Sequence, residues 1–348
     1  MKTTKLLYLI PAALGLSLVG ALAQSVASPP IGFDKKPTIA NADNYRSIPF
    51  TQKPAFAGLV DSVDGADVTL AGASFAGNDL VDAPHYIHFT DGSRVGEYFN
   101  ITAHTAGTLT VDLNGDNLTG VAAGDPVKVI PHWTLATLFP SGEQITSSTS
   151  PVDLGTQILL PDMMGDGINL PANQTFFYLG ALDKWFKVGS GSTDFSAQVV
   201  LPDSFMIIRE AGESHDGCFS GRVPTDPITI NLSAADSTEQ DNAVAIYRPI
   251  DVTLADSGLI SSGAFVASTS PVDIKDQLLV FEDGAGVNRP PAATYFYIAG
   301  ALNSWFKVGS GSTSFNDALV FLSGNSVLIR KAPVAGGFTS KWTNSPTY

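Results

Sequence analysis

The sequence predicts an all-β protein in which a small N-terminal barrel-like or sandwich-like region is followed by two tandem homologous β-modules. The 348 residues include 33 glycines and 22 prolines, which favour turns between short strands over long helices. Several short segments alternate apolar and polar residues with the period of two that is typical of half-buried strands. A long stretch of the sequence also occurs twice, which indicates a duplicated structural unit.

The chain begins with a pattern typical of a secretory signal peptide. Lys2 and Lys5 precede an apolar run over Leu6–Ala23, which ends with small residues at the positions that signal peptidases require. An uncleaved membrane anchor is the alternative, but the proline and glycines within the run weaken a spanning helix. We therefore expect residues 1–23 to be removed and the mature chain to be secreted. Its destination would be the periplasm, the cell surface or the medium, with no remaining membrane span.

Composition and charge narrow the classes of function. The chain has 33 acidic and 19 basic residues, a net charge of −14, so it offers no cationic surface for nucleic acid. Cys218 is the one cysteine of the sequence. An intramolecular disulfide is therefore impossible, and stability must come from packed cores and sheets.

Residues 24–133 are expected to form an N-terminal arm and the barrel-like region. Ser28–Lys53 is proline-rich with little periodicity and is interpreted as an extended arm or an early edge strand. Gly58–Leu70 consists of two alternating runs joined by an Asp-Gly turn, which is a strong hairpin signal. Further half-buried strands are predicted at Tyr98–Thr102, Thr108–Asp112 and Asp125–Ile130.

The duplicated unit occupies the rest of the chain. Ser148–Asp153 recurs as Ser268–Asp273, and Trp185–Thr193 recurs as Trp305–Thr313 at the same offset. Upstream, Leu109–Leu113 is matched with a similar segment beginning at Ile228, so both copies would extend back from the repeated motifs. We predict one module over 134–226 and a second over 227–348.

Each module is predicted to be a compact set of strands. Tyr178 and Leu179 lead through a short glycine-bearing connection into Trp185–Val188, which favours a hairpin, and Phe205–Ile208 supplies another strand. Arg209 and Arg330 end equivalent apolar strands and are interpreted as charges that discourage strand addition at an edge.

These motifs together resemble a known group of proteins. The start Pro30–Phe33, the hairpin at Gly58, and the order of aromatic strand, Trp-x-Lys-Val-Gly and Ile-Arg strand resemble an uncharacterised family of exported, β-rich, internally repeated proteins from verrucomicrobial bacteria. The resemblance covers nearly the whole mature chain. It implies a secreted bacterial β-protein and brings no catalytic residue with it.

The repeated tryptophan strand is the main candidate binding site. Alternation places Trp185 and Lys187 on one face and Phe186 and Val188 on the other. If the second pair fills the core, the tryptophan can stack on a sugar ring while lysine and tyrosine add contacts. The favoured alternative is that each tryptophan packs against a neighbouring strand or the other module. The candidate ligand-binding residues are Trp185, Lys187 and Tyr178, with Trp305, Lys307 and Tyr297 in the second copy.

A calcium site is considered at Asp112, Asn114 and Asp116, whose alternating oxygens match the first half of a calcium loop. The loop is incomplete, because Asn117 and Ala123 occupy the sixth and twelfth positions. No other cofactor is expected.

No catalytic constellation is recognisable. His215 and Cys218 are the raw material for a nucleophile and its base, but the second copy has neither. His85 and His88 lie three apart in a predicted strand, so their side chains would point to opposite faces and could not jointly bind a metal. The repeated acid Asp153 is explained by its turn.

The sequence as a whole favours an exported, non-catalytic structural or adhesive protein of the cell surface or extracellular matrix. Self-association through strand edges or through the Ser28–Lys53 arm, or contact with a surface polysaccharide, is the expected partnership. A carbohydrate-binding protein that uses the repeated Trp and Tyr faces is the first alternative. An extracellular hydrolase is the second alternative and has the least support.

Overall fold

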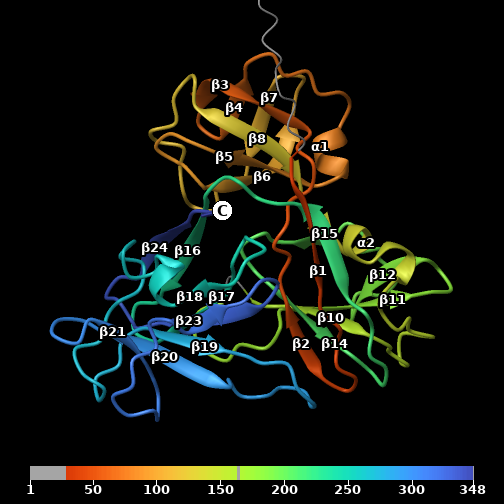
Figure 1. Cartoon of the computed structure of the whole chain (residues 1–348). Coiled ribbons are helices and arrows are strands. Elements are labelled where there is room, and N and C mark those ends of the chain that lie inside the picture. Colours follow the sequence, from red (N-terminus) through yellow and green to blue (C-terminus); the bar gives the residue numbers. More distant parts are fainter. Residues whose placement is uncertain (1–28, 163–164, 348) are drawn as a thin grey trace, which may run out of the picture.

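The computed structural model describes residues 29–162 and 165–347, and its architecture is all-β as predicted (Figure 1). Helical segments are confined to α1 (Asp79–Asp82), α2 (Leu135–Leu138) and the 3-10 turns η1 (Pro140–Gly142) and η2 (Ala255–Ser257). Within the described ranges no helix has the length and apolarity needed to cross a membrane. The predicted signal peptide, residues 1–23, lies outside the described residues.

The barrel-like region is a closed six-stranded barrel, at the top of Figure 1. Its inward-facing side chains include Val68, Ile87 and Leu109, none of which is measurably exposed. Alternation of these residues with polar ones produces the inside and outside of the barrel. In barrel order the strands are β3 (Phe56–Asp64), β4 (Asp67–Leu70), β7 (Thr108–Val111), β6 (Tyr98–His104), β5 (His85–Phe89) and β8 (Pro126–Pro131).

Two five-stranded antiparallel sheets lie below the barrel and share one strand order. Equivalent pairs occupy the same register, since Tyr178 faces Trp185 in one sheet and Tyr297 faces Trp305 in the other. The first sheet runs β12 (Lys184–Lys187), β11 (Gln174–Leu179), β10 (Gln157–Leu160), β14 (Met206–Arg209) and β2 (Asp43–Arg46). The second runs β21 (Ser304–Lys307), β20 (Ala293–Ile298), β19 (Gln277–Val280), β23 (Ser326–Lys331) and β17 (Gln240–Ala245).

Short strand pairs accompany each sheet, again in matching form. Two pairs accompany the first sheet: β1 (Ile31–Lys35) pairs with β15 (Cys218–Arg222), and β9 (Trp133–Thr134) pairs with β13 (Val199–Val200). With the second sheet go β16 (Ile228–Ala234) paired with β24 (Phe338–Asn344), and β18 (Val252–Thr253) paired with β22 (Leu319–Phe321).

The N-terminal arm belongs to the first sheet rather than to the barrel region with which it was grouped. Strand β2 pairs with β14 and forms the sheet edge, and β1 pairs with β15. The barrel is inserted between β2 and β9, whereas only residues 246–251 separate β17 from β18. The upstream match of Leu109–Leu113 with Ile228 is therefore wrong: Leu109 lies in barrel strand β7, and the counterpart of β16 is β1.

The two modules are joined by reciprocal contacts, which we call the module clasps. In the first clasp, Arg209 donates two hydrogen bonds to Asp43, from Nε to Oδ1 at 2.7 Å and from Nη2 to Oδ2 at 3.0 Å. Asn288, from the loop between β19 and β20, donates its backbone N–H to Asp43 Oδ2 at 2.7 Å and accepts from Arg209 Nη2 at 2.9 Å. The second module thus completes an ion pair of the first.

The second clasp repeats this arrangement in the opposite direction. Arg330 donates to Asp241 with the same two distances, 2.7 and 3.0 Å. Asn169, from the loop between β10 and β11, donates its backbone N–H to Asp241 Oδ2 at 2.8 Å and accepts from Arg330 Nη2 at 3.1 Å. The interpretation of Arg209 and Arg330 as charges that discourage strand addition at an edge is therefore wrong, because β14 and β23 are interior strands and each arginine binds an aspartate.

Candidate functional site

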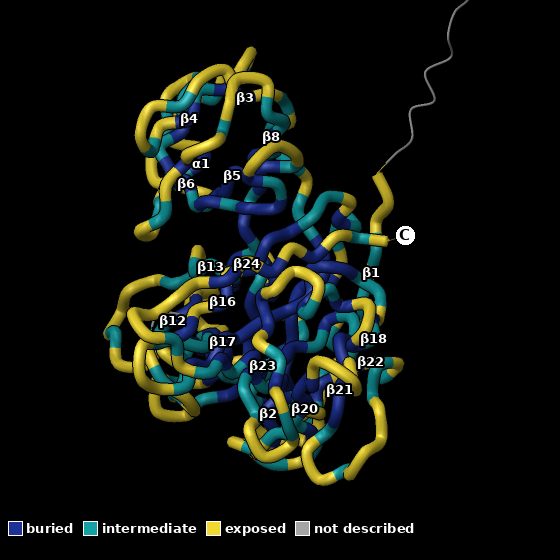
Figure 2. Tube along the Cα trace, turned by 90° about the vertical axis from the view of Figure 1, so that its left-hand side faces the viewer, coloured by how far each residue is buried: buried dark blue, intermediate teal, exposed yellow. Residues whose placement is uncertain are grey.

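The repeated tryptophans lie inside the modules and not on a surface. Trp185 and Trp305 are each 1% exposed. In the turned view of Figure 2, buried segments run through the middle of the modules and exposed segments follow the outline. Trp185 packs against Phe139, with ring centroids 5.7 Å apart, and Trp305 packs against Phe265 at 4.9 Å. A sugar ring in solvent cannot reach either indole.

The favoured alternative, in which each tryptophan is packed, agrees with this burial, and the outward placement of the tryptophan does not. Phe186 is also buried, against Phe177 on the opposite face of the sheet, while Val188 is 50% exposed. Both faces of the tryptophan strand are therefore covered, as happens when a second apolar cluster packs on the outer side of a sheet. The aromatic residues of this strand therefore belong to the interior of the module and do not mark a binding face.

The partners expected beside each tryptophan do not form a binding face. Tyr178 is buried and donates its hydroxyl to Asp183, and this hydrogen bond raises the pKa of the Tyr178 phenol to about 12. Lys187 lies over the ring of Phe195, 5.3 Å from its centroid. Tyr297 is buried and Lys307 is half-buried. The stacking site proposed from Trp185, Lys187, Tyr178 and their second-copy equivalents is thus not assembled.

The calcium candidates are engaged in other contacts. Asp116 accepts hydrogen bonds from Arg94 at 2.9 and 3.0 Å, and Lys341 lies 3.5 Å away. Asp112 accepts the backbone N–H of Asn114 at 3.0 Å. In the described part of the chain no group of three or more His, Cys, Asp or Glu side chains is placed to hold a metal ion. Arginine, rather than calcium, neutralises Asp116.

The histidines and the cysteine are also dispersed. His215 Nε2 lies 2.9 Å from Thr146 Oγ1, and Cys218 is exposed without a disulfide. His88 Nε2 lies 2.9 Å from the carbonyl oxygen of Pro227. His85 is the exception, because it lines a pocket with His132.

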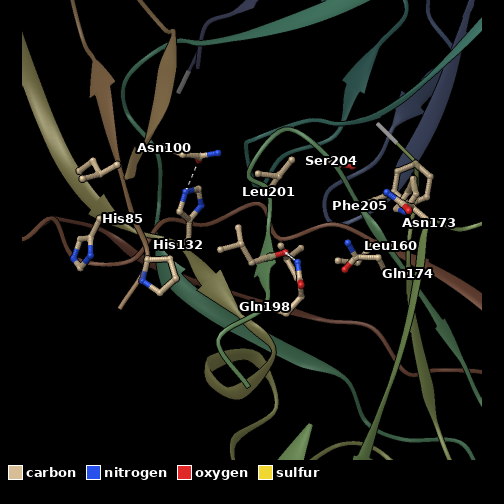
Figure 3. A pocket seen from close by; sticks show the side chains of 15 residues that line it. His85, Asn100, His132, Leu160, Asn173, Gln174, Gln198, Leu201, Ser204 and Phe205 are labelled. Atoms are coloured by element: carbon tan, nitrogen blue, oxygen red, sulfur yellow. Dashed lines mark hydrogen bonds between the residues drawn. The ribbon is translucent and has the colours of Figure 1, made fainter. Parts of the chain in front are cut away.

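That pocket, which we call the junction pocket, lies where the barrel meets the first module and has a volume of about 330 Å³. Figure 3 shows His85, Asn100 and His132 on one side, Asn173 and Gln174 on the other, and Gln198 between them. The remaining lining residues are Pro84, Ile101, Leu160, Pro161, Val199, Val200, Leu201, Ser204 and Phe205. Sequence reasoning missed this site because its walls come from segments that are adjacent only after folding.

His132 is held as a neutral imidazole in one tautomer. Its Nε2 lies 2.8 Å from Asn100 Oδ1, and since that oxygen can only accept, Nε2 carries the proton. The other nitrogen, Nδ1, is a buried acceptor with no partner among the described residues. Burial, reinforced by the nearby His85, lowers the pKa of His132 to about 3.

Acid should therefore destabilise the protein through His132. Between pH 6.5 and 3 the imidazole of His132 is protonated in the unfolded state and stays neutral in the folded state. The free energy of unfolding therefore falls as the pH drops towards 3. We expect a loss of about 2 kcal/mol from this group between pH 6.5 and 4.5. Denaturant unfolding at each pH measures it. The His132→Gln variant should show a shallower slope by close to one proton, and an unchanged slope would contradict the assignment.

A second pocket, of about 360 Å³, lies between the barrel and the linker that joins the modules. It is lined by Lys53, Lys128 and Arg222, and Lys128 is paired with Asp226. Asp226 is the one acid in this lining, and the junction pocket has none, so neither pocket brings two carboxylates together. Neither of these two pockets therefore has the pair of carboxylates that glycoside hydrolysis uses.

In comparisons with protein-family models, with curated proteins and with solved structures, the chain matches none. The resemblance to exported verrucomicrobial proteins stays a prediction.

Proposed function

We propose that the protein is an exported structural or adhesive component of the cell surface or extracellular matrix, and that it acts as a two-ended building block. The observation that carries this is a repeated pair of exposed apolar side chains. Val152 is 94% exposed and Leu182 57%, and their equivalents Val272 and Leu302 are 95% and 57% exposed. We call each pair an apolar tip.

The apolar tips sit on turns that do not need them for packing. Val152 lies in the Ser-Pro-Val-Asp turn, which is closed by the Asp153 N–H to the carbonyl of Ser150. Leu182 lies in the turn between β11 and β12, alongside the first turn, because Ser148 N donates to the carbonyl oxygen of Tyr178 at 2.8 Å. Single exposed apolar side chains are ordinary, whereas apolar side chains gathered in a patch mark contact surfaces, so the inference depends on the two side chains of each tip acting together.

The placement of the tips supports assembly in both directions. The β11–β12 hairpin and the β20–β21 hairpin lie on opposite sides of the molecule in Figure 1. A second copy of the chain that covers one tip leaves the other tip free, so contacts of this kind propagate. In the single chain the arm is paired within the first module, through β1 with β15 and β2 with β14, so the proposal rests on the apolar tips and not on the arm.

Static light scattering of the mature chain, starting at residue 24, tests this proposal. We expect concentration-dependent association that persists with a calcium chelator, since apolar contacts need no bridging ion. Val152→Ser with Leu182→Ser should stop assembly at dimers, and adding Val272→Ser with Leu302→Ser should give monomers. A wild-type chain that stays monomeric up to high concentration would overturn the proposal.

Phe33→Ser is the matched control, because Phe33 is 76% exposed on β1 but has no apolar equivalent on β16. It should associate like the wild type. Export is tested separately by cell fractionation, where retention of the full-length chain in the cytoplasm would contradict a surface or matrix role.

A further inference from the structure

Three amide side chains of the junction pocket are not needed by the module fold. The backbone positions match between the copies: Asn173 N donates to Leu160 O as Ala292 N donates to Val280 O. Gln198 N likewise donates to Phe195 O as Ala318 N does to Phe315 O. Where the first module has Asn173, Gln174 and Gln198, the second has Ala292, Ala293 and Ala318. The same fold therefore forms with alanine at all three positions.

Two buried acceptors in this lining have no protein donor. His132 Nδ1 and Gln174 Oε1 lack hydrogen-bond partners within the described residues. His132 is 3% exposed and, with Nε2 protonated, offers a lone pair at Nδ1. A buried acceptor without a donor costs about 1–3 kcal/mol, so a bound water or ligand that donates to both atoms would be stabilised in this cavity.

The rest of the lining sets the chemistry of that donor. The pocket contains no Asp, Glu, Lys or Arg side chain, although the chain as a whole has a net charge of −14. In Figure 3, Leu160 and Phe205 lie beside Gln174 and Asn173, and Leu201 lies between them and His132. We call these three apolar side chains the apolar wall. Its volume of about 330 Å³ is at the small end of ligand sites, which run from about 300 to 1,000 Å³. A small, uncharged ligand with hydroxyl donors and apolar C–H faces meets these requirements.

We propose that the junction pocket binds a neutral sugar, as a monosaccharide or the terminal unit of a glycan. Hydroxyl groups donate to His132 Nδ1 and Gln174 Oε1, the amides of Asn173 and Gln198 bind neighbouring hydroxyls, and the apolar wall contacts the ring. The barrel insertion creates this site, because the second module has no barrel beside the equivalent alanines. The inference does not depend on association through the apolar tips.

Saturation-transfer NMR on the mature chain tests the proposal with named probes: glucose, galactose, mannose, N-acetylglucosamine, cellobiose and lactose, with glucuronate as the charged comparison. We expect transfer to at least one neutral sugar and none to glucuronate. Asn173→Ala with Gln174→Ala and Gln198→Ala copies the second module, so it should keep the wild-type melting temperature. Losing two or three neutral hydrogen bonds should weaken binding about 10–100-fold.

Gln157→Ala is the matched control, since Gln157 lies on β10 of the same module outside the pocket lining. It should bind like the wild type. The proposal is overturned if no neutral sugar shows saturation transfer at millimolar concentration, if glucuronate binds equally well, or if the folded triple variant binds as the wild type does. None of these outcomes bears on the light-scattering test, so the two proposals fail separately.

Discussion

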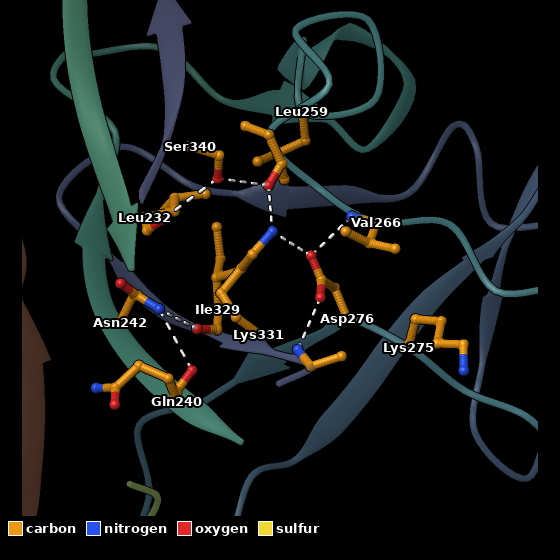
Figure 4. Close-up of polar contacts among 12 residues, drawn as sticks. Leu232, Gln240, Asn242, Leu259, Val266, Lys275, Asp276, Ile329, Lys331 and Ser340 are labelled. Atoms are coloured by element: carbon orange, nitrogen blue, oxygen red, sulfur yellow. Dashed lines mark hydrogen bonds and ion pairs between the residues drawn. The ribbon is translucent and has the colours of Figure 1, made fainter. Parts of the chain in front are cut away.

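Replacing Lys331 by methionine should cost about 3–5 kcal/mol of unfolding free energy, because it leaves the buried carboxylate of Asp276 without its cation. Lys331 and Asp276 side chains are 3% and 0% exposed. The ammonium group binds Asp276 and the carbonyl oxygen of Ala264 (Figure 4). Asp276 also accepts the backbone N–H groups of Val266 at 2.7 Å and Ala332 at 2.9 Å, so it cannot rotate out to water without breaking both.

The first module has a different pair at the same position, without a lysine or arginine of the described residues beside the buried carboxylate of Glu210. Thr156 replaces Asp276 and Glu210 replaces Lys331, with Thr156 Oγ1 donating to Glu210 Oε2 at 2.6 Å. Thr156 Oγ1 also accepts from Thr146 N at 2.8 Å, which is the bond that Asp276 makes in the second module. Threonine is thus compatible with the surrounding backbone.

The stability of Lys331→Met should therefore be compared with that of the double variant Asp276→Thr, Lys331→Met. Removing both charges avoids an uncompensated buried ion, so the double variant should be more stable than Lys331→Met by about 2 kcal/mol or more. Urea unfolding of the wild type, both single variants and the double variant completes the cycle. Equal stability of Lys331→Met and the double variant would show that the carboxylate needs no cation here.

The barrel and the sheets could be predicted because their signals are local. Period-two alternation and the Asp-Gly turn at Asp64 are contained within a few residues, and the segment that begins at Trp185 repeats letter for letter from Trp305 to Thr313. The first copy of the module is interrupted, however. Strand β2 shares with its counterpart β17 little more than the pair Asp43 and Asn44, which corresponds to Asp241 and Asn242. The whole barrel also separates β2 from β9 in the sequence.

The site was harder to predict for a related reason. Trp185 looks like a ligand platform only if one face of its strand is bare, and whether Phe186 is covered depends on tertiary packing. Gln174 and Gln198 were visible as departures from alanine in the second copy, but nothing local shows that both face His132 across a pocket. Divergence between repeats is thus the one sequence signal that could have pointed to the junction pocket.

Removing both module clasps should have the other large effect, about 4–6 kcal/mol. Asp43 and Asp241 side chains are 2% and 7% exposed, and each holds an arginine of its own module and a backbone N–H of the other. Alanine at either position leaves those donors unpaired, which costs about 2–3 kcal/mol because the arginine partners keep partial access to water. The two sites share no partner, so the losses should add.

The clasps also position the two loops, together with backbone hydrogen bonds from Asp43 N to Gly286 O and from Asp241 N to Gly167 O. Asn288 and Asn169 adopt positive φ angles of 52° and 54°, which asparagine tolerates better than most residues, and each places its N–H on the opposite aspartate. Losing Asp43 and Asp241 together should loosen both loops and weaken the coupling of the modules, which then depends on contacts such as the Arg46–Asp283 ion pair. We therefore expect the single unfolding transition to separate into two in the Asp43→Ala, Asp241→Ala double variant.

Calorimetry of the two single variants and the double variant measures both effects. Asp273→Ala is the control, because Asp273 is a repeated but exposed acid paired with Lys275, and its loss should change stability by no more than about 0.5 kcal/mol. If Asp241→Ala matches that control, the clasp is a surface ion pair and the modules are held together by other contacts. If the double variant keeps one transition despite a large loss of stability, the clasps stabilise each module without coupling them.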